Sequence, residues 1–109
     1  MTTKTERTRA LNDALRAGGS DGRLMVTRGL AALPINELQV IFDAVQTFSD
    51  FNADNDPYGE HDCALLTAAG QNVMFKIDYY DLAMSGGSED PSDPSQTCRV
   101  LTIMLTSEY

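Results

Sequence analysis

A polar, turn-forming stretch at residues 52–62 divides this 109-residue chain into two parts with different sequence patterns. The stretch contains the only histidine, four of the sixteen acidic residues, and several Asn, Asp, Pro and Gly residues, which are typical of turns. Before it, apolar residues recur mainly at helical spacing. After it, they mostly follow the two-residue period of a strand. We therefore expect a protein that combines helices and strands.

Two helices and one strand are predicted before this stretch. The first helix covers residues 5–17 and ends at a glycine pair, and a short strand follows at residues 23–28. The second helix begins at Pro34 and stops near Asp50. The apolar face of the first helix consists of Ala10, Leu11, Ala14 and Leu15. That of the second consists of Ile35, Leu38, Ile41, Phe42, Val45 and Phe48.

Three strands are predicted after the stretch. Residues 62–68 and 72–80 form a hairpin around a short turn. The last strand, residues 97–106, carries apolar side chains on both faces, which is typical of a strand inside a sheet. Residues 81–96 contain two Gly, two Pro and several acids, and we expect them to form a long acidic loop, either a mobile flap or a binding loop.

The resulting order α-β-α-β-β-β predicts an α+β fold, with two helices packed on one face of an antiparallel-rich sheet of about four strands. Residues 1–109 are expected to form a single domain in which residues 1–5 fray. No secretory signal or membrane-length apolar run is evident, so we expect a cytoplasmic protein. Cys63 and Cys98 lack the paired spacing of a zinc site or disulfide framework, which favours reduced thiols.

Charge is distributed unevenly along the chain, whose net charge is −8. Residues 1–28 have a net charge of +3, whereas residues 29–109 contain only two bases and thirteen acids, a net charge of −11. Such a field repels nucleic acid and membrane surfaces and attracts basic partners. The alternative is that the negative charge only keeps the protein soluble and attracts no particular partner.

The start of the turn-forming stretch resembles a calcium-binding loop. Asp54, Asp56 and Gly59 occupy the first, third and sixth positions of such a loop. The fifth and twelfth positions are Tyr58 and Leu65, so two oxygen ligands are missing. We therefore expect a tight turn built by Asp and Asn side chains, with no metal and no other cofactor.

His61 is the second candidate for chemistry. It lies between Glu60 and Asp62, and either carboxylate could orient the imidazole as a general base, with Tyr58, Tyr79 or Tyr80 as proton donor. However, neighbouring side chains on a strand point to opposite faces, and no nucleophile motif is present. The sequence therefore favours a non-catalytic protein over an enzyme.

Several longer runs carry a resemblance to a known family. They are residues 9–16 (RALNDALR), 27–33 (TRGLAAL), 54–62 (DNDPYGEHD), 76–81 (KIDYYD), 87–94 (GSEDPSDP) and 99–105 (RVLTIML). On these runs the chain resembles a family of small bacterial proteins classed only as a domain of unknown function. The resemblance extends from about Arg9 over nearly the whole chain. It implies a bacterial, intracellular setting on plasmids or prophages and assigns no catalytic residue.

These observations favour a non-catalytic binding module that inhibits or modulates a basic, nucleic-acid-handling bacterial protein, as DNA-mimicking anti-CRISPR or antirestriction proteins do. We expect it to bind neither nucleic acid nor membranes directly. The predicted interaction surface consists of Asp54, Asp56, Tyr58, Glu60, Asp62, Asp78, Tyr80, Asp81, Glu89, Asp90 and Asp93. Two alternatives stay open: a small enzyme or divalent-metal-dependent binder centred on residues 54–62, and a structural adaptor that forms homodimers or larger assemblies.

Overall fold

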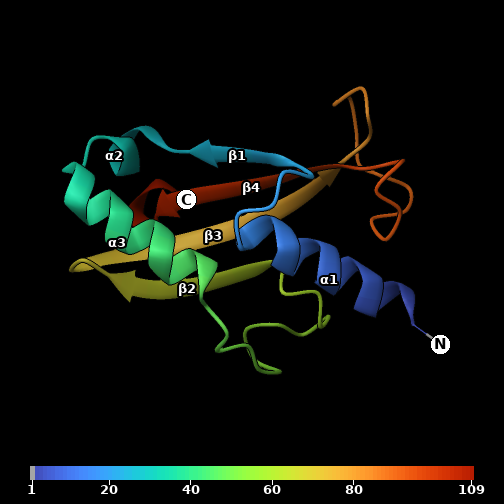
Figure 1. Ribbon diagram of the computed structural model, residues 1–109, viewed down its shortest axis with the longest axis horizontal. Coiled ribbons are helices and arrows are strands. Elements are labelled where there is room, and N and C mark those ends of the chain that lie inside the picture. Colours follow the sequence, from blue (N-terminus) through green and yellow to red (C-terminus); the bar gives the residue numbers. More distant parts are fainter. Residues whose placement is uncertain (1) are drawn as a thin grey trace.

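A four-stranded sheet in the order β1-β4-β3-β2 forms the centre of the structure (Figure 1). The computed structural model describes residues 2–109. The strands are β1 (Arg23–Val26), β2 (Cys63–Ala68), β3 (Gln71–Tyr80) and β4 (Cys98–Leu105). The helices are α1 (Lys4–Arg16), α2 (Arg28–Ala31), α3 (Ile35–Gln46) and a short 3₁₀ helix, η1 (Thr106–Glu108).

The sheet is mostly antiparallel, as predicted. Strands β2 and β3 form the expected hairpin, β3 pairs with β4 in antiparallel fashion, and β1 pairs with β4 in parallel. Strand β4 lies between two neighbours, which confirms the prediction made from its two apolar faces. Leu101 and Ile103 face the helices, Val100 and Met104 face the other way, and all four are buried.

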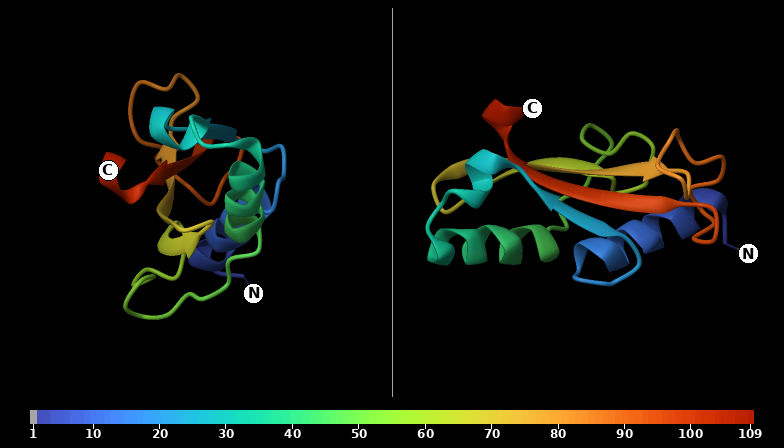
Figure 2. Two further views of the ribbon diagram at one scale, coloured as in Figure 1. Left: turned by 90° about the vertical axis from the view of Figure 1, so that its left-hand side faces the viewer. Right: turned by 90° about the horizontal axis from the view of Figure 1, so that it is seen from above.

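Helices α1 and α3 lie on the same face of the sheet, as expected for this α+β fold (Figure 2). The alternating residues Val73, Phe75 and Ile77 of β3 point toward them and are buried. Ile41 and Val45 of α3 complete this side of the core. The apolar side chains predicted to share one face of the strand and one face of the helix therefore pack against each other in a single core layer.

The buried face of α1 differs from the prediction. Its buried residues are Thr8, Asn12, Leu15 and Arg16. Ala10 and Ala14, which were assigned to an apolar face, are exposed. The reason is that α1 packs mainly against polar groups of the loops and of the sheet, described below, so apolar spacing was a poor guide to its orientation.

The predicted strand at residues 23–28 is too long, and α2 was not predicted. The strand ends at Val26, and the chain turns into α2 so that Leu30 becomes fully buried. The carboxylate of Glu108 accepts hydrogen bonds from the Thr27 hydroxyl at 2.6 Å and the Gly29 amide at 2.8 Å. This turn therefore depends on a residue some eighty positions away, which local sequence patterns do not reveal.

Helix α3 is shorter than predicted and ends at Gln46 instead of near Asp50. The Arg16 guanidinium donates to the carbonyl oxygens of Val45 at 3.2 Å and Phe48 at 2.7 Å, and so caps the end of the helix from outside. Pro34 precedes the first turn, as expected. Ile35 does not belong to the apolar stripe, because 79% of its surface is exposed.

Candidate functional site

Two acidic loops belong to the same half of the sheet. Strand β2 begins opposite Lys76, four residues before β3 ends, and the last residue of β3, Tyr80, pairs with the first residue of β4, Cys98. The loop that leads into β2, residues 52–62, and the loop between β3 and β4, residues 81–97, therefore belong to the same half of the sheet; in Figure 1 the first lies below the sheet and the second lies beyond the tip of β3. We call these two loops, with the end of β3, the acidic end.

Carboxylates of the acidic end influence one another. Burial raises the pKa of the Asp62 carboxyl, and the negative charges of Glu60, Asp56 and Asp78 raise it further. Burial and the charge of Asp62 also raise the pKa of the Cys63 thiol. Cys63 is a free cysteine that is disfavoured as a thiolate, and Cys98 is also free.

The basic helix α1 lies along this end and neutralises part of its charge. Lys4 forms a salt bridge with Asp90 at 3.5 Å, and the Arg9 guanidinium donates to the Gly59 carbonyl at 2.6 Å. The Lys4 ammonium is mostly exposed, so this ion pair contributes little to stability. The contacts nevertheless place the positive part of the chain against both acidic loops.

A single buried amide, that of Asn12, connects α1 to the acidic end. Its Nδ2 donates to the Glu60 carbonyl at 2.9 Å and to the Tyr79 hydroxyl at 2.7 Å, and its Oδ1 accepts from Arg99 Nε at 2.7 Å. The Tyr79 hydroxyl in turn donates to the Glu60 carboxylate at 2.7 Å. Asn12 has no exposed surface. One side chain thus joins α1, the 52–62 loop, β3 and β4.

Arg99 is the charged member of this network and is only 2% exposed. It donates to Asn12 and to the Pro91 carbonyl, and its guanidinium lies 5.2 Å from the centre of the Tyr79 ring. Burial lowers the pKa of Arg99, and burial likewise raises the pKa of the Tyr79 hydroxyl. Neutral acceptors and an aromatic face thus hold this cation. Its contact with Pro91 fixes the 81–97 loop to the same network.

His61 forms a second tie between α1 and the 52–62 loop. Its Nδ1 lies 2.8 Å from Asp13 Oδ1, and its Nε2 lies 3.6 Å from Asp56 Oδ2. The imidazole stacks on the Phe51 ring with 3.9 Å between centroids. Both ring nitrogens therefore face carboxylates, and no hydroxyl or thiol in residues 2–109 forms a hydrogen bond with the ring. This environment suits a structural cross-link better than a general base.

The carboxylates that orient His61 are not the ones predicted. Glu60 accepts from Tyr79 instead, and Asp62 does not contact the imidazole. The backbone explains this outcome: His61 adopts a left-handed conformation with φ of 55°, and its amide donates to Asp56 Oδ1 at 3.0 Å. The loop therefore turns at His61, and Asp56 reaches it from five positions earlier.

The calcium-loop pattern forms the expected turn. The Asn52 side chain accepts from the amides of Asp54 and Asn55, and Asp56 is buried against His61. Within residues 2–109, no three His, Cys, Asp or Glu side chains are placed to hold a metal ion. In the same part of the chain, no helix has the length and apolarity needed to cross a membrane.

Many carboxylates of the 81–97 loop accept hydrogen bonds within the loop. Asp81 accepts from the Ser85 amide at 3.0 Å, Asp90 from the Ser92 hydroxyl at 2.6 Å, and Asp93 from the Ser95 hydroxyl at 2.7 Å. These bonds lower the pKa of each of the three carboxyls. The carboxylates thus hold the turns of the loop by accepting hydrogen bonds in their ionised form.

The remaining predicted surface residues differ in accessibility. Asp54, Tyr58 and Glu89 are exposed. Asp78 forms an ion pair with Lys76 on the sheet face opposite the helices, and Tyr80 is half-buried on that face. The structure therefore places the predicted residues in two loops and along the end of β3, and only some of them are exposed.

Sequence reasoning missed the residues that hold this end together, above all Asn12, Asp13 and Arg99. One signal for them exists in the sequence: Thr8, Asn12 and Arg16 recur at four-residue spacing and mark a polar buried face. Arg99 was a second signal, since it is a lone base inside an otherwise apolar strand.

The Asn12 network predicts a large loss of stability in Asn12→Ala, because Arg99 and Tyr79 would lose a buried partner. We expect the free energy of unfolding to fall by about 2–4 kcal/mol, measured by urea denaturation. Asn72→Ala is the matched control, since Asn72 is exposed and accepts only one long hydrogen bond, at 3.4 Å. Equal urea midpoints for the two variants would contradict this role of Asn12.

The raised pKa of Asp62 predicts a pH-dependent gain of stability in Asp62→Asn. Since the folded state disfavours the ionised carboxylate, the protein loses stability as pH rises through the folded pKa, and the amide avoids that loss. The variant should be more stable than the native chain at pH 7, by less than about 1 kcal/mol because the site is partly solvated. At pH 3, below the ordinary value of 3.8, the difference should vanish. A difference that is the same at both pH values would rule out ionisation as its cause.

Comparisons with known proteins identify a family for this chain but no activity. No curated protein matches it, and no solved structure does. A family model described as "Protein of unknown function (DUF3768)" matches residues 26–108, which include both acidic loops and strands β2 to β4 but not α1. The match covers well over half of the chain, and the protein therefore belongs to this family of unknown function.

Proposed function

We propose that this protein is a non-catalytic binding module whose acidic end docks onto a basic protein. The observation that supports this most directly is that both acidic loops belong to the same half of the sheet. Loops that leave the same half of the sheet can contact one partner together. Carboxylates distributed over both would then add their electrostatic attraction at a single interface.

The carboxylates of the 81–97 loop are ionised at neutral pH, because even the ordinary aspartate pKa of 3.8 lies far below it. The turns of the 81–97 loop lower the pKa values of Asp81, Asp90 and Asp93. The exposed carboxylates of Asp54 and Glu89 have no hydrogen-bond partner among residues 2–109, and exposed Tyr58 adds an aromatic group of a type common at interface centres.

The partner we propose is a nucleic-acid-handling protein with a basic groove. Carboxylates at the acidic end would compete with phosphates for the Lys and Arg side chains of such a groove, and binding would release the counterions held at those side chains. The protein would thus act as an inhibitor or modulator of the anti-CRISPR or antirestriction type. An enzymatic role has less support, since both nitrogens of His61 face carboxylates.

Capture from bacterial lysate tests this proposal. The immobilised chain should retain a basic protein at about 50 mM salt and release it at 200 mM salt, the range over which phosphate-type contacts weaken strongly. Double-stranded DNA added at low salt should release the same protein. The proposal is contradicted if the chain retains no basic protein at low salt. It is also contradicted if neither 200 mM salt nor DNA releases the retained protein.

A matched pair of variants locates the surface. Asp54→Asn with Glu89→Gln removes two charges from the acidic end, and Glu37→Gln with Asp43→Asn removes two from α3. The first variant should lose at least about threefold in affinity for the captured protein, whereas the second should stay close to the native chain. Equal losses would mean that net charge, and not the acidic end, governs binding.

A further inference from the structure

The free edge of β1 forms a second surface, separate from the acidic end. This strand is the last in the sheet order, and nothing in residues 2–109 pairs with its outer side. The Thr27 amide donates to the Ile103 carbonyl, and hydrogen-bonding direction alternates along a strand. The backbone N–H and C=O groups of Leu24 and Val26 therefore point outward, away from β4.

Two consecutive side chains of this edge are apolar and exposed on opposite faces of the sheet. Leu24 is 55% exposed on the helix face, and Met25 is 54% exposed on the other face. Leu24 lines a cavity between the sheet and α3 and is therefore only partly covered by the helix. Exposed apolar side chains on a free edge favour pairing with another segment.

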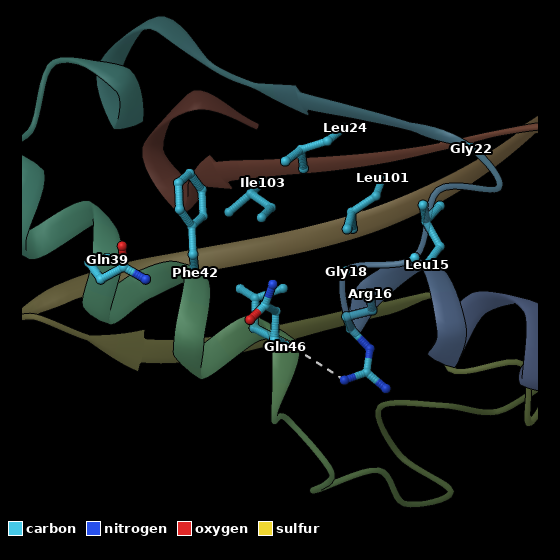
Figure 3. Close-up of a pocket in the computed structure, with 12 residues that line it drawn as sticks. Leu15, Arg16, Gly18, Gly22, Leu24, Gln39, Phe42, Gln46, Leu101 and Ile103 are labelled. Atoms are coloured by element: carbon cyan, nitrogen blue, oxygen red, sulfur yellow. Dashed lines mark hydrogen bonds between the residues drawn. The ribbon is translucent and has the colours of Figure 1, made fainter.

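A cavity adjoins the edge on each face. On the helix face, a cavity of about 300 Å³ is lined by Leu24, Leu101, Ile103 and Phe42, among others. Figure 3 shows Leu24 beside Ile103, with the Phe42 ring rising from α3 toward them. On the opposite face, a cavity of about 470 Å³ includes Met25, Val100, Tyr80 and Met84 in its lining.

We propose that the β1 edge binds an extended peptide segment of a partner protein as a fifth strand. Added strands gain affinity from backbone hydrogen bonds and specificity from side chains that alternate between two faces. Here the two faces present an apolar cavity each, so the segment carries at least two adjacent apolar residues. One covers Leu24 and the next covers Met25.

Charge defines the flanks of this segment. Arg23 is the first residue of β1, and Arg28 begins α2 two residues after the strand ends; both are exposed and form no ion pair in residues 2–109, in a chain of net charge −8. Acidic residues on both sides of the apolar pair complement them. A second copy of this chain fits less well, because pairing β1 with its own counterpart brings the same arginines near one another.

Binding of two labelled peptides tests the proposal on the full chain. The first has the sequence Glu-Glu-Val-Leu-Val-Ile-Glu-Glu, and the second has Lys in place of each Glu. The acidic peptide should bind at least about tenfold more tightly, although the net charge of the protein favours the lysine peptide. Tighter binding of the lysine peptide, or no saturable binding of the acidic one, overturns the proposal.

A proline scan of the two sheet edges locates the binding. Leu24→Pro removes an outward N–H from β1, and Leu65→Pro does the same at the opposite edge, in β2, where Leu65 is 66% exposed. The first change should weaken binding of the acidic peptide at least about tenfold, and the second should leave it within about twofold. The opposite pattern, or equal effects, contradicts binding at β1.

Two further measurements keep the test decisive if Leu24→Pro fails to fold. Arg23→Gln with Arg28→Gln alters only exposed side chains and should weaken binding of the acidic peptide at least about threefold. Saturation with this peptide should also slow amide exchange at Leu24 and Val26 and leave Leu65 unchanged. Unchanged exchange at β1 overturns the proposal, as does a homodimer whose contact at β1 excludes the peptide. Neither outcome bears on the acidic end.

Discussion

The hydrogen bonds of the buried Asn12 amide are the interaction on which the arrangement of this protein depends. They link the Arg99 guanidinium to the Tyr79 hydroxyl and to the backbone of the 52–62 loop. A buried cation without a carboxylate partner is costly unless other groups stabilise it; here the Asn12 and Pro91 oxygens accept from Arg99, and its guanidinium lies against the Tyr79 ring. The same bonds hold α1 in place, since its buried face offers few apolar contacts.

This network explains how a strongly acidic end can keep a defined shape. Burial raises the pKa of Asp62 and the charges of Glu60, Asp56 and Asp78 raise it further, so both effects oppose a compact, ionised arrangement of the 52–62 loop. Arg99 holds the 81–97 loop through Pro91, and Asn12 and His61 hold the 52–62 loop through α1. The basic part of the chain thus serves chiefly to organise the acidic part.

Sequence patterns predicted the elements whose burial is apolar and missed those whose burial is polar. The alternation in β3 and the two apolar faces of β4 were sufficient to place both strands. The orientation of α1 was not predictable from apolar spacing, because Thr8, Asn12 and Arg16 form its buried face. The partner of His61 was missed for a related reason: Asp13 lies 48 positions away, and only the packed helix brings it to the imidazole. The sequence predicted the two acidic loops and the strands that flank them. It did not predict the hydrogen bonds that the carboxylates accept within those loops.

The rigidity of the two acidic loops tests this account most directly, through ¹⁵N relaxation of the backbone amides in residues 52–62 and 81–97. If the network holds the loops in one arrangement, their order parameters should approach those of the sheet, about 0.85. Values below about 0.6 throughout both loops would show that the network does not fix the acidic end, and they would contradict the account.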